Sequence, residues 1–272
     1  YGLRLAGTNR SDVILATEQA RTVYGLAGND ILSASGAELL TDLYGGEGDD
    51  VYRMFADNGS VFINDNVGAN IVEFADLTLS ELSVTYNSPY QQFSWHDSSG
   101  INRTVTLYDG TSVAEFKFAD GTKLSELRND GTSLVVGGTA ENDRLSGSSV
   151  DNKLFGYGGS DVLLGSSGVD MFDGGTGFDA VSYENSSSGV GVRFDNRNYN
   201  FGDAAGDTYI SIEQINGSSF DDVLFGTIGD QVIVAGAGAD TLNGLEGHDT
   251  IFGGAHNDHV MGGEGNDRLH GD

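Results

Sequence analysis

The sequence lacks cysteine altogether and has a single proline, Pro89, in 272 residues. The absence of cysteine excludes a disulfide framework and thiol redox chemistry. Basic residues are scarce, since 13 Lys and Arg face 41 Asp and Glu and leave a formal net charge of −28. Without a basic patch to neutralise phosphates, nucleic acid and anionic membrane surfaces are excluded as expected partners.

Long apolar runs are also missing, so the sequence predicts no transmembrane segment. The opening residues, YGLRLAGTNR, do not form a charged and then apolar signal peptide. There is no nucleophile elbow and no phosphate-binding loop, and HNDH at residues 256–259 is not a zinc-protease motif. We therefore expect no catalytic site in this chain and no enzymatic activity of its own.

Glycine, in contrast, is abundant, with 42 residues, and it marks a nine-residue repeat. The repeat occupies residues 138–182 and 217–270 without interruption, and a looser block lies within residues 7–53. The eighth residue of every copy is apolar or aromatic: Ile14, Val23, Leu32, Tyr52, Leu145, Leu154, Leu163, Phe172, Val181, Leu224, Ile233, Leu242, Ile251, Val260 and Leu269. A unit with one such residue cannot bury it alone, so the units must stack into a solenoid.

The sixth residue is aspartate in twelve of the fifteen copies: Asp12, Asp30, Asp50, Asp143, Asp161, Asp170, Asp179, Asp222, Asp240, Asp249, Asp258 and Asp267. The last three residues of a copy suit a short strand whose central side chain points inward, and the glycine-rich part before it suits a sharp turn. Turn chemistry alone explains some aspartates, but not their return at one register twelve times.

This pattern, G-G-x-G-x-D-x-U-x, is the known signature of calcium-binding β-helix repeats. The chain resembles the repeats-in-toxin (RTX), or haemolysin-type calcium-binding, family over about half of its length. The resemblance implies an all-β fold, a right-handed parallel β-roll in three blocks with one coil per two nonapeptides. Aspartates eighteen residues apart then face a common gap, where hard oxygen ligands suit Ca²⁺ better than Mg²⁺ or Zn²⁺.

With two copies per coil, alternate copies lie above one another along the same edge of the roll. Pairing their sixth residues along each edge predicts seven calcium sites, between the pairs 12/30, 30/50, 143/161, 161/179, 222/240, 240/258 and 249/267. Two pairs should be weak or empty because Asn152 and Gln231 replace aspartate, namely 152/170 and 231/249. The edge that carries Arg21 and Thr41 should bind no metal. Backbone carbonyls of the turns are expected to complete the sites, as at Gly25, Gly45, Gly156, Gly158, Gly174, Gly236, Gly244, Gly253 and Gly262.

High charge and high glycine content oppose folding, and seven Ca²⁺ would offset half of the net charge. We therefore expect the repeat blocks to be largely disordered without calcium and to fold on binding it. The resemblance implies export by a type I secretion system of a Gram-negative bacterium and a secreted or cell-surface location. The abrupt ends of the sequence suggest a segment of a longer protein.

Two stretches break the repeat and divide the chain into five parts. Residues 54–137 alternate apolar and polar residues, which predicts a β-rich region, and FADGT near Asp120 resembles the haemolysin-type calcium-binding-related region. Residues 183–216 are expected to form a β linker with a strand at VGVRF. The rolls are therefore predicted at residues 1–53, 138–182 and 217–272.

Aromatic residues gather in the first interruption: Tyr86, Tyr90, Phe93, Trp95 and Tyr108. Such residues fill small β cores, or they form a platform for sugars. Polysaccharide and further copies of the chain are therefore left open as partners beside Ca²⁺. The favoured function is a calcium-binding segment with a structural or adhesive role, in an adhesin, a surface layer or a matrix. The alternative is a non-catalytic accessory domain of a secreted protease, lipase or polysaccharide-modifying enzyme.

Overall fold

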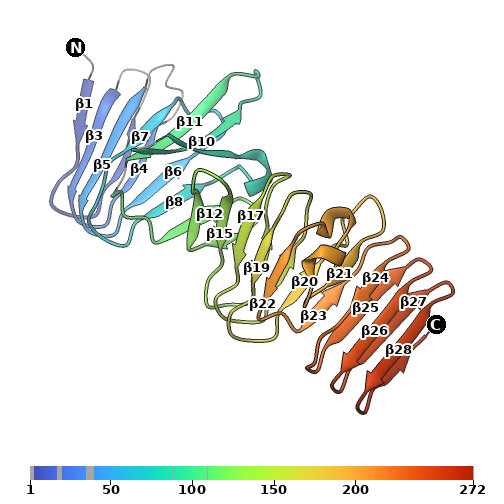
Figure 1. Ribbon diagram of the computed structural model, residues 1–272. Helices are drawn as coiled ribbons and strands as arrows, with labels where there is room; N and C mark the ends of the chain where they lie inside the picture. Colours follow the sequence, from blue (N-terminus) through green and yellow to red (C-terminus); the bar gives the residue numbers. More distant parts are fainter. Residues whose placement is uncertain (1–2, 17–19, 35–39, 88, 109, 272) are drawn as a thin grey trace. The chain divides into compact units, whose positions relative to one another are not determined.

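The computed structural model describes residues 3–16, 20–34, 40–87, 89–108 and 110–271. It is an all-β parallel solenoid in which successive short strands alternate between facing sheets (Figure 1). The chain divides into two compact units, residues 1–131 and 132–272. No helix in the described part of the chain has the length and apolar character needed to span a bilayer.

The first unit contains two sheets. One has the order β1 (Leu3–Ala6), β3 (Ala20–Ala27), β5 (Thr41–Glu47), β7 (Val61–Ile63), β11 (Asn102–Tyr108), β10 (Tyr90–His96) and β9 (Ser83–Asn87). The other has the order β13 (Lys123–Leu124), β12 (Glu115–Phe118), β8 (Ile71–Phe74), β6 (Val51–Met54), β4 (Ile31–Ala34) and β2 (Val13–Ala16). The unit also contains the short 3₁₀ helix η1 (Leu79–Glu81) and the strand β14 (Glu126–Asn129).

Part of the region between the first two repeat blocks continues the roll. Strands β7 and β8 pair in parallel with β5 and β6, and β11 and β12 pair in parallel with β7 and β8. Strands β9 and β10 depart from the solenoid, since they form an antiparallel ribbon beside β11, and the short strand β13 pairs antiparallel with β12. Strands β7, β8, β11 and β12 therefore add coils to the same two sheets.

The second unit contains one long sheet and two shorter ones. The long sheet has the order β16 (Arg144–Ser146), β18 (Val162–Leu164), β20 (Ala180–Ser182), β23 (Gln214–Asn216), β25 (Val232–Ala237), β27 (Thr250–Ala255) and β29 (Arg268–His270). One shorter sheet includes β15 (Leu134–Gly137), β17 (Asn152–Phe155), β19 (Met171–Asp173) and β22 (Thr208–Ile210). The other has β21 (Gly191–Arg193), β24 (Val223–Phe225), β26 (Thr241–Glu246) and β28 (His259–Glu264).

The stretch 183–216 contributes one strand to each of the three sheets of the second unit. Strand β21 lies within the VGVRF segment, and β22 and β23 extend the flanking sheets. Two 3₁₀ helices, η2 (Arg197–Tyr199) and η3 (Gly202–Ala204), occupy the rest of the connection. The stretch therefore contributes strands to the roll, in addition to linking its blocks.

The strand register follows the repeat. Leu145 lies beside Leu163 and Leu163 beside Val181, so residues eighteen apart stack and two nonapeptides make one coil. The eighth residues form the core, and Leu32, Tyr52, Leu163, Phe172 and Leu242 are fully buried. Leu269, in the last strand, is 49% exposed because no coil covers it in this sequence.

Candidate metal sites

The sixth residues of the repeats stack along the edges of the rolls, as the edge sorting predicted. The backbone N–H of each donates to a side-chain oxygen of the sixth residue one coil further on, from Asp12 to Asp30 at 2.7 Å and from Asp143 to Asp161 at 2.8 Å. The same bond joins the pairs 30/50, 161/179, 222/240, 240/258, 249/267, 152/170 and 231/249. All nine pairs weighed from the sequence are therefore neighbours.

This ladder uses one oxygen of each carboxylate and leaves the other for a different role. In six aspartates the second oxygen, Oδ2, is buried and has no hydrogen-bond partner: Asp30, Asp50, Asp161, Asp179, Asp240 and Asp249. A buried and unpaired carboxylate oxygen is costly, so such an oxygen is expected to find a cation. These six oxygens are the strongest structural indication of metal binding.

The turn glycines explain how backbone oxygens reach the same place. The Oδ2 of Asp161 and the carbonyl oxygen of Gly174, one coil further on, both converge over the Cα of Gly156, where a Cβ would clash with them. The carbonyls of Gly25, Gly45, Gly156, Gly244 and Gly262 are placed in the same way over the first glycine of the preceding coil. Hard oxygens converging from a carboxylate and from backbone carbonyls fit Ca²⁺.

Two of the remaining expected carbonyls belong to other turn positions. Gly236 is the second residue of its turn, and the carbonyl of Ala235 takes the first position, 2.5 Å from where a Cβ on Gly217 would lie. Gly158 is the third residue of its turn and lies beside Thr176. Among the described residues no three His, Cys, Asp or Glu side chains gather as a metal cluster.

Burial makes these carboxylates harder to ionise in the absence of a cation. Loss of solvation, the largest cause, raises the pKa of Asp50 and of Asp240 to about 6. The same cause raises the pKa values of Asp30, Asp161 and Asp249. The pKa of Asp12 is instead lowered, because the backbone N–H and the hydroxyl of Thr8 donate to its carboxylate.

The pair 152/170, expected to be weak, contains an internal substitute for a cation. The side-chain amide of Asn152 donates to the carbonyl of Ser148 at 2.9 Å and to Oδ1 of Asp170 at 2.8 Å. It therefore delivers hydrogen-bond donors to oxygens that would otherwise face an ion. In the pair 231/249, Oε1 of Gln231 accepts from the backbone N–H of Thr227 at 2.7 Å.

Several edge residues escaped sequence reasoning because their units lack the full set of turn glycines or the eighteen-residue spacing. Asn70 accepts from Asp50 N–H, Asp207 from Asp170 N–H and Glu213 from Asp179 N–H. Asn70 belongs to the degenerate unit DNVGANIVE at residues 65–73, whose eighth residue, Val72, is fully buried. A search for the sixth and eighth positions alone, with spacings other than eighteen allowed, could have found it.

The edge carrying Arg21 and Thr41 is only partly described. Thr41 is buried and its hydroxyl donates to the carbonyl of Ala20 at 3.1 Å. The turn residues 17–19 and 35–39 lie outside the described residues. The absence of metal on this edge stays a prediction.

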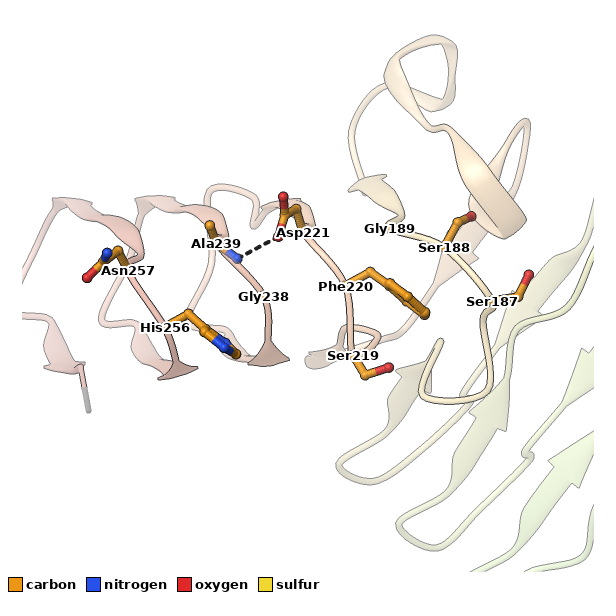
Figure 2. Close-up of a pocket in the computed structure, with 10 residues that line it drawn as sticks. All are labelled: Ser187, Ser188, Gly189, Ser219, Phe220, Asp221, Gly238, Ala239, His256 and Asn257. Atoms are coloured by element: carbon orange, nitrogen blue, oxygen red, sulfur yellow. Dashed lines mark hydrogen bonds between the residues drawn. The ribbon is translucent and has the colours of Figure 1, made fainter.

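A second ladder, from the fifth residues, holds neighbouring turns together. Figure 2 shows it where Asp221 accepts from the backbone N–H of Ala239 at 2.8 Å. These turns line a shallow depression of about 670 Å³, with the side chains of Phe220 and His256 on the same side. His256 has φ 90° at the fourth position, where the neighbouring turn has Gly238.

Comparison with known proteins supports the assignment of the repeats. The family model for the RTX calcium-binding nonapeptide repeat matches residues 6–36, 137–172, 146–181, 211–242 and 234–269, together about half of the chain. The solved structure of the extracellular lipase LipA from Serratia marcescens is similar at 14% identity and a TM-score of 0.27, over 97% of this chain and 33% of that chain. The chain thus spans a third of the lipase, and no curated protein gives a significant match. The chain belongs to the RTX calcium-binding repeat family.

Proposed function

We propose that this chain is a segment of a secreted bacterial protein that folds on extracellular Ca²⁺ and serves a structural or adhesive role, with no catalytic centre of its own. The observation that carries the calcium dependence is the set of six buried carboxylate oxygens without a partner. Without a cation they add buried repulsion to a chain that already has a net charge of −28. A bound ion removes that cost only in the folded state, so its binding energy stabilises folding.

Far-ultraviolet circular dichroism tests the proposal directly. The purified chain should show a β-rich spectrum in millimolar calcium and a largely disordered spectrum after chelation. Magnesium at equal concentration serves as the control and should not restore the β signal, because Mg²⁺ demands a tighter octahedral site. An identical spectrum with and without chelator would refute the calcium dependence.

An aromatic face on the first unit supports the adhesive role. Tyr24 and Tyr44 stack on neighbouring strands with their ring centroids 5.1 Å apart. The ring centroid of Tyr108 lies 5.6 Å from that of Phe62 and 5.0 Å from that of Tyr90. The pKa of Tyr44 is raised mainly by burial and then by the charges of Asp42, Tyr24 and Tyr108. The Tyr24–Tyr44 pair therefore lies near the cluster of Phe62, Tyr90 and Tyr108. The rings extend over β3, β5, β7, β11 and β10, about 19 Å at the usual strand spacing.

The aromatic group expected from the sequence is therefore divided between two faces. Phe93 and Trp95 are buried in the core, and the indole N–H of Trp95 donates to the carbonyl of Ala56 at 2.9 Å. Tyr90 and Tyr108 lie on the outer face, where Gln92 and Thr106 line a hollow beside them. Tyr86 pairs with Gln91, which puts it on the face of Phe93.

A neutral polysaccharide is the occupant that this face fits. Flat aromatic rings offer apolar contact to sugar rings, and their hydroxyls together with Gln92 and Asp42 offer hydrogen bonds. The row is long and shallow, which suits an extended chain better than a single sugar. Asp42 at the centre and the overall negative charge disfavour an anionic polymer.

Affinity electrophoresis in gels that contain neutral polysaccharides tests this role. Tyr44→Ala and Tyr108→Ala should abolish retardation of the chain, while Tyr86→Ala, an aromatic loss on the opposite face, should leave it unchanged. Retardation that survives both outer-face substitutions would refute sugar binding at this site. The accessory-domain alternative predicts a catalytic domain elsewhere in the full-length protein, which its sequence would reveal.

A further inference from the structure

The turns of the roll fall into two classes that differ at the second residue of the repeat. In closed turns the second residue is Ser or Thr and donates a hydrogen bond to the side chain of the sixth residue. Thr139 shows this most fully, because its N–H at 2.6 Å and its hydroxyl at 3.0 Å both donate to Oδ2 of Asp143. The six closed turns pair Thr8 with Asp12, Thr139 with Asp143, Ser148 with Asn152, Ser166 with Asp170, Ser218 with Asp222, and Thr227 with Gln231.

In open turns the second residue has a positive φ, which turns its N–H away from the sixth residue. This conformation occurs in eight turns, with φ between 71° and 109°, at Leu26, Gly46, Tyr157, Gly175, Gly236, Leu245, Gly254 and Gly263. Leu and Tyr adopt it at a steric cost, so the surrounding structure must favour it. Six of these eight turns contain the aspartates with an unpartnered buried Oδ2, and the other two contain Asp258 and Asp267, which are only half-buried.

We infer that the second residue of the repeat decides whether a turn holds calcium. This inference rests on the proposed calcium binding and adds the rule that distributes the ions. In six of the eight open turns the sixth residue presents a buried carboxylate oxygen with no other partner. A closed turn already supplies one or two hydrogen bonds to that oxygen, and an ion would have to displace them.

The rule changes the distribution expected from aspartate spacing. The pairs 12/30, 143/161 and 222/240 begin with closed turns and lose their ion, although both members are aspartates. The pairs 30/50, 161/179, 240/258 and 249/267 begin with open turns and retain it. The pairs 152/170 and 231/249 begin with closed turns and stay empty.

Two further sites follow, at turns that the nonapeptide pattern does not show. The Oδ2 of Asp50 faces Oδ2 of Asp65 and the hydroxyl of Tyr52 over the Cα of Gly45. Both carboxylates are buried, and only that of Asp65 receives the Tyr52 hydroxyl. At the other turn, the carbonyl of Ser211 converges with Oδ2 of Asp179 over the Cα of Gly174.

Exchanging the second residue in one turn of each class tests the rule. Ser218→Gly should open the Asp222 turn, and Leu245→Ser should close the Asp249 turn. Ser219→Gly is the matched control. Ser219 lies in the same turn as Ser218, but among the described residues only Ser218 donates hydrogen bonds from this turn to the Asp222 carboxylate. Bound calcium per chain is measured by equilibrium dialysis and atomic absorption, on variants whose calcium-induced β signal confirms folding.

We expect one more ion per chain in Ser218→Gly, one fewer in Leu245→Ser and no change in Ser219→Gly. An unchanged ion count in Leu245→Ser would overturn the rule even if Ser218→Gly does not fold. A gain in both Ser218→Gly and Ser219→Gly would overturn it too, because glycine alone would then explain the effect. If the unaltered chain bound no calcium, the proposed function itself would fail, which separates the two outcomes.

Discussion

Asp161→Asn offers the sharpest single test of how a carboxylate couples calcium to stability. Asp161 is 1% exposed, its Oδ1 accepts from Asp143 N–H at 2.8 Å, and its Oδ2 has no partner. Asparagine keeps the first oxygen and puts an N–H donor where the unpartnered oxygen lies, close to the carbonyl of Gly174. Asn152, on the other edge of the same roll, shows that a side-chain amide can donate a hydrogen bond to a turn carbonyl.

The magnitude follows from the loss of one ion. Extracellular calcium modules bind with dissociation constants of about 10⁻⁴ to 10⁻³ M. At calcium concentrations about 10 to 100 times the dissociation constant, one site contributes roughly 1.4 to 2.7 kcal/mol to the free energy of unfolding. For a unit about the size of residues 132–272, this loss lowers Tm by roughly 3 to 10 °C.

The assay is thermal unfolding by circular dichroism over a series of calcium concentrations. The variant should melt lower than the unaltered chain at high calcium, and its Tm should rise less steeply with the logarithm of calcium concentration, because fewer ions bind on folding. Asp143→Asn is the control, since Thr139 already satisfies that carboxylate, and it should keep the original steepness. An unchanged steepness in Asp161→Asn would refute the reasoning.

Further outcomes are expected for the core, for pH and for the tryptophan. Leu163→Ala removes a fully buried side chain of the stack and should cost about 2 to 5 kcal/mol in urea unfolding at saturating calcium, whereas Leu15→Ala, at a site 53% exposed, should cost far less. The folded-state pKa values of Asp50 and Asp240, about 6, lie above the unfolded value of 3.8. Without calcium, the stabilisation that protonation of these two carboxylates gives to the folded state is therefore fully present below pH 3.8 and is lost as the pH rises through about 6. Below about pH 6, protons also compete with calcium for the same carboxylates. Calcium titrations on either side of that pH should show weaker binding on the acid side, and equal affinity would contradict it. Trp95 is 2% exposed, so its fluorescence should not change when polysaccharide is added.

The two interruptions show where the nine-residue period no longer predicts the fold. Residues 65–73 and 208–216 build coils of the roll with Asn70 and Glu213 at the sixth position, yet neither has the full set of turn glycines. Their turns are stabilised by other contacts, such as the Tyr52 hydroxyl on Asp65. Because parallel pairing needs only a compatible strand and not a particular turn, the roll extends beyond its recognisable repeats.

The sequence by itself determined the solenoid, its coil length and the alignment of the aspartates, because each depends on a local period of nine residues. Leu163 between Leu145 and Val181 needed no more than that period. Only the tertiary structure decided which carboxylate oxygens remain free, since this depends on whether the second residue of each turn donates or turns away. It also decided which aromatic rings face out, because the side of a sheet that a strand presents depends on its register with its neighbours.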